Sequence, residues 1–212
     1  TGGSVANTGL AMKKLGADVS LMGKVGDDEF GRMILGILDQ YKAMDGMITD
    51  KESSTSYSVV LSIPGIDRIF LHNPGANNTF TKEDLNFDLI KEAGLFHFGY
   101  PTIMQKMYED GGDELAGIFK AVKECGCMTS LDMSAVDENT KAGKADWYGI
   151  LEKTLPYVDF FLPSVEEICY MLDKEKYDAL QNRANGGDIT EVLSIEEDVV
   201  PLAEKILNMG CK

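Results

Sequence analysis

Histidine, basic residues and long apolar runs are all scarce in this 212-residue sequence. Its 20 lysines and arginines face 35 aspartates and glutamates, which gives a formal net charge of −15. This balance argues against a nucleic-acid or anionic-membrane surface, because such surfaces need basic patches. No apolar run in the sequence approaches the roughly 20 residues of a transmembrane helix. The remaining composition, 44% hydrophobic and 26% charged residues, is typical of a soluble globular protein with a sizeable core.

The few thiols and imidazoles do not form a metal or redox motif. Cys125 and Cys127 are spaced C-G-C, which differs from the C-x-x-C of redox and zinc sites. His72 and His97 are the only histidines, too few for a typical zinc cluster or a convincing Ser-His-Asp arrangement. We therefore expect reduced cysteines in a cytoplasmic protein. His97 lies inside an apolar stretch and is expected to be a core residue with satisfied hydrogen bonds.

Strand and helix periodicities alternate along most of the chain. The pattern predicts helices at 4–15, 30–41, 113–124, 147–155 and 164–172, and strands at 19–22, 95–99, 127–133 and 158–163. Alternation with short connections implies right-handed crossovers and a parallel sheet covered by helices on both faces, which is an α/β fold. The polar residues 174–194 are expected to be a mobile surface insertion.

Residues 55–72 change to a period of two, which predicts an antiparallel hairpin with one apolar and one polar face. The stretch "PGIDR" at 64–68 supplies the turn of this hairpin. A polar face inside an α/β chain suggests a flap over solvent or ligand. His72 is placed on the polar face with Ser58 and Ser62, where simple exposure and ligand contact fit the pattern equally well.

Polar residues follow the expected strands of the parallel sheet, and ligands bind beyond the carboxyl ends of such strands. This rule selects three positions: Gly99-Tyr100, Asp132 and Pro163-Ser164. Ser164 can cap the helix that follows, and Glu166 and Glu167 suit its first turn. A carboxylate at this place can also orient water on Mg²⁺. From the residues alone, capping is the favoured interpretation.

Gly2 and Gly3 stand before the first helix, and Asn7 lies one helical turn further on. Glycines let a ligand approach the backbone closely because no Cβ is present. The Asn7 amide adds a donor and an acceptor suited to sugar hydroxyls. The spacing is neither G-x-G-x-x-G nor a phosphate-binding P-loop, so an ordinary glycine-rich turn is favoured on spacing alone.

Taken in order, these stretches resemble the PfkB carbohydrate kinase family, also called ribokinase-like. The stretch "GGSVANTGLAMKKLG…GKVGDDEFG" resembles its N-terminal signature, "STSYSVV…DRIFLHNPGAN" its lid hairpin, and "FHFGYP", "SLDMS" and "FLPSVEEI" its later strand ends. The resemblance covers the chain except residues 174–194. It implies a mostly parallel sheet with helices on both faces and a small β lid. Residues 1–212 would form a single partial domain with the lid inserted at about 44–74.

The resemblance also implies a reaction, the transfer of the γ-phosphate of ATP to a sugar hydroxyl with Mg²⁺. Gly2, Gly3 and Asn7 match the sugar-contacting loop of the family, and His72 and Tyr100 are further candidates for substrate binding.

Gly99 stands where ribokinases place a substrate-binding glutamate, which weakens the case for ribose but keeps Gly99 in the candidate substrate site. Glu167 matches the glutamate of the N-x-x-E motif, which is linked to magnesium and phosphate. Ser164 replaces the asparagine of that motif. Ser164 and Glu167 are therefore candidate cofactor-binding residues, and Glu167 is the candidate metal-binding residue.

The family pattern extends past both ends of this sequence. It begins with a strand that carries a sugar-binding aspartate, and it ends with a glycine-rich anion hole and a general-base aspartate. We therefore expect this sequence to be an inactive fragment of a kinase, with the general base beyond Lys212. Two alternatives stay open: an adenosine-like nucleoside kinase of the same fold, and a non-catalytic sugar-binding module. The apolar hairpin face is covered either by a second copy in a homodimer or by its own domain.

Overall fold

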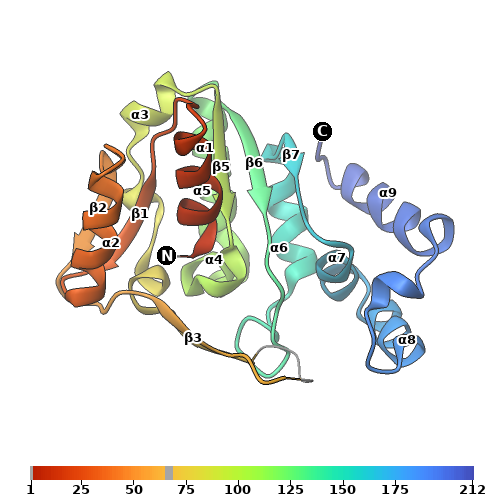
Figure 1. Cartoon of the computed structure of the whole chain (residues 1–212). Coiled ribbons are helices and arrows are strands. Elements are labelled where there is room, and N and C mark those ends of the chain that lie inside the picture. Colours follow the sequence, from red (N-terminus) through yellow and green to blue (C-terminus); the bar gives the residue numbers. More distant parts are fainter. Residues whose placement is uncertain (1, 65–68) are drawn as a thin grey trace. The chain divides into compact units, whose positions relative to one another are not determined.

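The computed structural model describes residues 2–64 and 69–212, so most of the turn expected at 64–68 lies outside the described residues. The chain forms two compact units, unit 1 (Thr1–Leu89) and unit 2 (Ile90–Lys212). Parallel strands alternate with helices in both units, which confirms the α/β class (Figure 1). No helix in the described part of the chain has the length and apolar character needed to cross a bilayer.

Unit 1 opens with a π-helical segment, Val5–Gly9, that continues into helix α1 (Leu10–Lys14), as predicted. Strand β1 (Met22–Gly26) pairs in parallel with β2 (Gly46–Asp50). The strand therefore begins where the expected strand at 19–22 ends. The reason is that Val19 packs against the core of unit 1 and its carbonyl accepts a hydrogen bond from Lys13 at 2.9 Å, outside the strand pairing.

Helix α2 (Glu29–Asp39) forms where its apolar period predicts a helix. Leu38 is buried in the small core of unit 1, beside Leu10 and Leu21. Phe30 and Met33 from the same helix remain 51% and 62% exposed. The predicted apolar face of this helix is therefore only partly covered.

The hairpin consists of β3 (Tyr57–Leu61) and β4 (Ile69–Asn73), paired antiparallel. Ser58 and His72 lie opposite each other, and Ser58 Oγ is 2.8 Å from His72 Nδ1, so they share a face as predicted. That face is not polar throughout, however, because Val60 and Phe70 lie on it and are 47% and 57% exposed. The period of the first strand did not reveal which residue of the returning strand would lie opposite Val60.

The chain leaves the hairpin through two 3₁₀ turns, Gly75–Thr79 and Lys82–Asp84, and reaches α3 (Phe87–Glu92). The Lys24 ammonium of β1 lies 3.1 Å from the Asp84 carboxylate and donates to the Thr79 carbonyl at 3.1 Å. Both charged side chains are largely shielded from water, with 12% and 15% exposure. This pair fixes the second turn against β1.

Unit 2 holds a parallel sheet with the order β5-β6-β7 (Leu95–Gly99, Met128–Asp132, Phe160–Phe161), which Figure 1 shows side by side. The helices between and after the strands are α4 (Gln105–Tyr108), α5 (Asp113–Glu124), α6 (Trp147–Thr154) and α7 (Val165–Leu172). Phe96 and Phe98 of β5 meet Phe119 of α5 edge to face, each at 6.2 Å between ring centres. These aromatic contacts pack α5 on the sheet.

Residues 174–194 contain regular structure that their polarity did not predict. They contain helix α8 (Lys174–Ala184), and Leu180 and Ile189 are 1% and 2% exposed. The Lys176 ammonium donates to the Glu197 carbonyl at 2.8 Å and lies 3.3 Å from the Asp198 carboxylate. Two buried apolar side chains and a partly buried ion pair therefore hold a segment whose composition is mostly polar. The chain then ends with α9 (Val200–Asn208).

Asp159 joins the start of β7 to β6 and α5 inside unit 2. Its Oδ2 accepts hydrogen bonds from Lys123 Nζ at 2.7 Å and from the Thr129 backbone nitrogen at 2.9 Å. Burial of the Asp159 carboxyl raises its pKa, but the hydrogen bonds from Lys123 and Thr129 outweigh this and bring the pKa from 3.8 to about 2. The ionised form is therefore the one that the fold stabilises.

We predict that Asp159→Asn destabilises the protein by about 2 kcal/mol at pH 7, because the folded state binds the Asp159 proton less tightly than the unfolded state. This contribution is present above about pH 4 and disappears as the pH falls toward 2. Thermal unfolding followed by circular dichroism measures the difference between the two proteins at each pH.

Asp113→Asn is the matched control, because Asp113 is 71% exposed and pairs with Lys153 on the surface. It should change the melting temperature little at any pH. An Asp159→Asn difference that stays constant down to pH 2.5 would contradict the assignment.

Candidate functional site

The N-terminal segment of unit 1 leaves open space around its glycines. A Cβ placed on Gly2 or Gly3 would meet no described heavy atom within 4 Å. Gly3 has a φ of +78°, a conformation that favours glycine, whereas Gly2 has no such requirement. Asn7 lies in the π-helical segment and is exposed. This segment therefore presents backbone groups and one amide to solvent or to a ligand.

His72 lies in the same unit but on the hairpin. Its side chain is exposed, and its hydrogen bond to Ser58 spans the two strands. The structure thus places His72 on the hairpin surface, as the alternation predicts.

The carboxyl ends of three strands meet at one edge of unit 2. Gly99, the last residue of β5, pairs in register with Asp132, the last residue of β6. Leu162, directly after β7, donates its backbone N–H to the Leu131 carbonyl at 2.9 Å, and Ser164 begins the turn into α7. Residues separated by more than 60 positions therefore reach the same edge, where parallel α/β proteins bind ligands. The Gly99–Tyr100 peptide bond at this edge is cis.

Three ionisable groups at this edge, those of Tyr100, Asp132 and Glu167, have raised pKa values. Burial raises the pKa of the Glu167 carboxyl, and the negative charge of Asp132 raises it further, although hydrogen bonds with Ser164 oppose the shift. Burial also raises the pKa of Asp132 and that of Tyr100, whose phenol in addition senses the charges of Asp132 and Glu167. The Asp132 and Glu167 carboxylates thus bring negative charge to this edge, and a bound cation would stabilise their ionised forms.

Ser164 and Glu167 form a reciprocal cap on α7. Ser164 Oγ accepts from the Glu167 backbone nitrogen at 3.2 Å, and Glu167 Oε2 accepts from the Ser164 backbone nitrogen at 2.8 Å. This is the capping arrangement that the residues alone favour. It holds the Glu167 carboxylate at the helix start, beside the strand ends.

The Glu167 carboxylate has capacity beyond the cap, because a carboxylate accepts up to about four hydrogen bonds. Among the described residues, no group of three or more His, Cys, Asp and Glu side chains could hold a metal ion. Asp132 and Glu167 are a pair of carboxylates, which suits Mg²⁺ bound mainly through water and phosphate.

His97 differs from the expected core residue with satisfied hydrogen bonds. Its Nδ1 lies 3.0 Å from Ser130 Oγ on β6, but its Nε2 is buried and has no hydrogen-bond partner among residues 2–64 and 69–212. The apolar neighbours in the sequence predicted the burial, but they could not show that only one ring nitrogen would find a partner.

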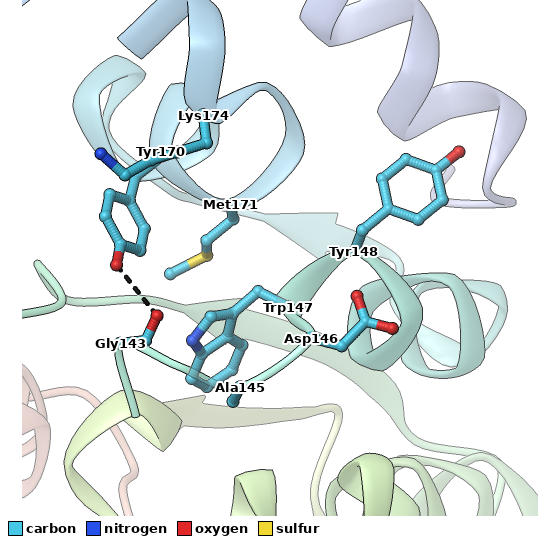
Figure 2. Close-up of a pocket in the computed structure, with 8 residues that line it drawn as sticks. All are labelled: Gly143, Ala145, Asp146, Trp147, Tyr148, Tyr170, Met171 and Lys174. Carbon is cyan, nitrogen blue, oxygen red and sulfur yellow. Dashed lines mark hydrogen bonds between the residues drawn. The ribbon is translucent and has the colours of Figure 1, made fainter. Parts of the chain in front are cut away.

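A separate pocket of about 230 Å³ lies in unit 2, away from the predicted site residues. It is lined by Gly143, Ala145, Asp146, Trp147, Tyr148, Tyr170, Met171 and Lys174 (Figure 2). Figure 2 shows the Tyr170 hydroxyl directed at the Gly143 carbonyl, to which it donates at 3.0 Å. The Trp147 indole donates to the Ala142 carbonyl at 2.7 Å. These aromatic side chains fasten the loop before α6 rather than stand free for a ligand.

Comparison with known proteins gives these features a context. Residues 1–200 match the model of the pfkB family carbohydrate kinases. A fructokinase of Solanum tuberosum is 34% identical over 134 residues, which are 62% of this chain and 41% of that protein. A probable fructokinase-6 of Arabidopsis thaliana, described as chloroplastic, is 35% identical over 134 residues, which are 62% of this chain and 34% of that protein.

A solved structure shares the fold. The fructokinase from Xylella fastidiosa with bound ATP superposes with a TM-score of 0.71 at 20% identity, covering 99% of this chain and 58% of that one. The chain therefore spans less than two thirds of the length of each of these relatives. The family match over residues 1–200 and the shared fold lead to one conclusion: the chain belongs to the pfkB family of carbohydrate kinases.

Proposed function

We propose that the protein transfers the γ-phosphate of ATP to a hydroxyl of a sugar. The observation that carries this proposal is the family match over residues 1–200. The strand-end carboxylates of unit 2 and the open glycine segment of unit 1 support it, because phosphoryl transfer depends on positioning and on charge neutralisation.

On the sugar side, the proposed contacts are the backbone of Gly2 and Gly3 and the amide of Asn7. His72, Gly99 and Tyr100 are proposed as further substrate contacts. Fructose is the first candidate substrate, because relatives at 34% and 35% identity are named fructokinases. Gly99 offers no carboxylate to a sugar, which favours fructose over ribose.

On the phosphate side, Ser164 and Glu167 are the proposed cofactor-binding residues. We propose that Glu167, with Asp132 beside it, holds Mg²⁺ through its bound water, while Ser164 keeps the Glu167 carboxylate in place. When bound, Mg²⁺ would neutralise charge on the ATP phosphates. Serine in place of the asparagine of the motif fits this role, since both residues cap helices.

The alternative functions, the location in the cell and the oligomeric state stay predictions. A nucleoside kinase of the same fold and a non-catalytic sugar-binding module are the two alternatives. A cytoplasmic location is our proposal for this protein. We also propose a homodimer that forms through the hairpin. It is supported by three apolar side chains on one hairpin face, Val59, Leu61 and Leu71, which are 46%, 41% and 56% exposed.

The direct test is sugar-dependent release of ADP, measured with fructose, ribose, adenosine and 2-keto-3-deoxygluconate in the presence of ATP and Mg²⁺. We expect the full-length natural protein to turn over a sugar, with fructose first. Turnover with adenosine alone would establish the nucleoside kinase instead. Sugar binding in a thermal-shift assay without any turnover would favour the binding module.

We predict that Gly3→Ala raises the KM for the sugar about tenfold or more, because the new Cβ occupies the space proposed for sugar hydroxyls. Gly16→Ala is the matched control, since Gly16 also has a positive φ, +91°, and open space around it. Both substitutions carry a similar backbone cost. If both variants shift KM equally, the effect is conformational and Gly3 is not a sugar contact.

We further predict that Glu167→Gln lowers kcat about 10- to 100-fold at saturating sugar and raises the Mg²⁺ concentration needed for half-maximal rate. Glutamine still fits the capping box, so the helix start should remain folded. Glu166→Gln is the control, because Glu166 is exposed and accepts from Gln181 at 3.0 Å. An unchanged Mg²⁺ dependence in Glu167→Gln would remove Glu167 from the metal site.

A further inference from the structure

The stretch "VGDDEFG", which runs from the end of β1 into the first turn of α2, forms a hydrogen-bonded anchor at the base of the hairpin. Asp28 Oδ2 accepts from the Thr55 backbone nitrogen at 2.7 Å, and Asp28 Oδ1 accepts from the Thr55 hydroxyl at 2.6 Å. The same Oδ1 accepts from the Gly31 backbone nitrogen at 2.8 Å, which caps α2. One carboxylate therefore ties a helix start to the segment that enters the hairpin.

Thr55 is the buried centre of this anchor. It is only 2% exposed, although the two strands that follow it are exposed along their length. The Gly26 backbone nitrogen donates to the Thr55 hydroxyl at 2.9 Å, so this hydroxyl both donates and accepts. A buried hydroxyl with both roles filled is costly to remove.

The glycines of the stretch allow the close packing that the anchor needs. A Cβ on Gly26 would lie 2.4 Å from the Ser53 carbonyl oxygen, and one on Gly31 would lie 2.1 Å from the Gly26 carbonyl oxygen. Both distances are far below van der Waals contact. A side chain at Gly26 would push the hairpin entry away from β1, and one at Gly31 would push the start of α2 away from the end of β1.

The end of the returning strand β4 is hydrogen-bonded to Ser54, the residue next to Thr55. The Ala76 backbone nitrogen donates to the Ser54 carbonyl at 2.8 Å, and Asn73 Nδ2 donates to Ser54 Oγ at 3.2 Å. From there toward the turn, β3 and β4 pair with each other, residues 57–61 with 69–73. The hairpin thus has a fixed base and an exposed remainder that carries His72.

We propose that Asp28 is a positioning residue that acts through Thr55 to set the place of the hairpin, and with it His72, relative to the rest of unit 1. Only the expected effect on sugar binding rests on the proposed sugar kinase function. Ordering of the hairpin base is a property of the chain itself. The three hydrogen bonds, those from Thr55 first, also lower the pKa of Asp28 to about 2, so the anchor stays ionised at neutral pH.

The test compares Thr55→Val, Thr55→Ser and Asp28→Asn with the unchanged protein. Valine keeps the shape of threonine but removes the acceptor of the Gly26 N–H and the hydroxyl that donates to Asp28 Oδ1. We expect amide hydrogen exchange in 57–61 and 69–73 to become about tenfold faster or more in Thr55→Val and Asp28→Asn, and serine to restore slow exchange. The double variant Thr55→Val/Asp28→Asn should be little worse than either single variant, because the two residues act as one unit.

Thr154→Val is the matched control, because Thr154 is fully buried in unit 2 and its hydroxyl donates to the Ile150 carbonyl at 2.8 Å. It should leave exchange in the hairpin unchanged. Hairpin exchange equal to that of the unchanged protein in Thr55→Val, or an equal increase in Thr154→Val, would overturn the anchor.

Steady-state kinetics distinguish a misplaced hairpin from a loss of folded protein. Unfolding lowers the apparent kcat and leaves KM unchanged, whereas a misplaced hairpin raises the KM for the sugar. We expect Thr55→Val and Asp28→Asn to raise KM about tenfold with a similar kcat, and Thr55→Ser to restore it. Faster exchange with unchanged KM would overturn the positioning role of Asp28. If the full-length natural protein turns over no sugar, the proposed function fails, and the exchange experiment still decides whether the anchor exists.

Discussion

Hydrogen bonding between parallel strands is the constraint on which the candidate site of unit 2 depends. Because β5, β6 and β7 run in the same direction, their carboxyl ends meet at one edge. Gly99, Asp132 and the start of α7 are far apart in the sequence, and strand register alone brings them together. The influence of the Asp132 charge on the pKa of Glu167 follows from this arrangement. The aromatic contacts of Phe119 with β5 keep α5 on the sheet, and Asp159 joins β6 to the start of β7.

Unit 1 depends on a different kind of interaction. Its apolar core is small, centred on Leu10, Leu21 and Leu38, while Phe30 and the hairpin strands stay exposed. Satisfied buried polar groups supply the order that apolar packing does not. The Asp28–Thr55 anchor fixes the hairpin base, and the Lys24–Asp84 pair fixes the turn that follows. A partner that is removed from such a network leaves a buried donor or acceptor unpaired, which costs more than the hydrogen bond itself contributes.

The sequence predicted the elements whose apolar residues form a complete buried face. Strand 95–99 and helix 113–124 match residue for residue, because Phe96, Phe98 and Phe119 bury one another. It missed β2, whose residues Gly46–Asp50 carry no clear period, and α8, where Leu180 is the single buried side chain of a polar helix. At the candidate site, the strand-end rule selected Asp132 and Ser164, and residue type predicted the cap on α7. The coupling of Asp132 to Glu167 depends on strand register, and the Asp28–Thr55 hydrogen bonds join residues 27 positions apart, so neither could be read from local pattern.

The central claim is that the backbone of the N-terminal glycine segment binds a sugar. Two-dimensional ¹⁵N–¹H spectra of the labelled protein, recorded while fructose is added, measure this without any need for turnover. We expect saturable shifts of the Gly2, Gly3 and Asn7 amide signals, with the Gly16 signal unchanged. Signals of Gly2, Gly3 and Asn7 that stay in place while fructose, ribose or 2-keto-3-deoxygluconate shifts other residues would contradict it.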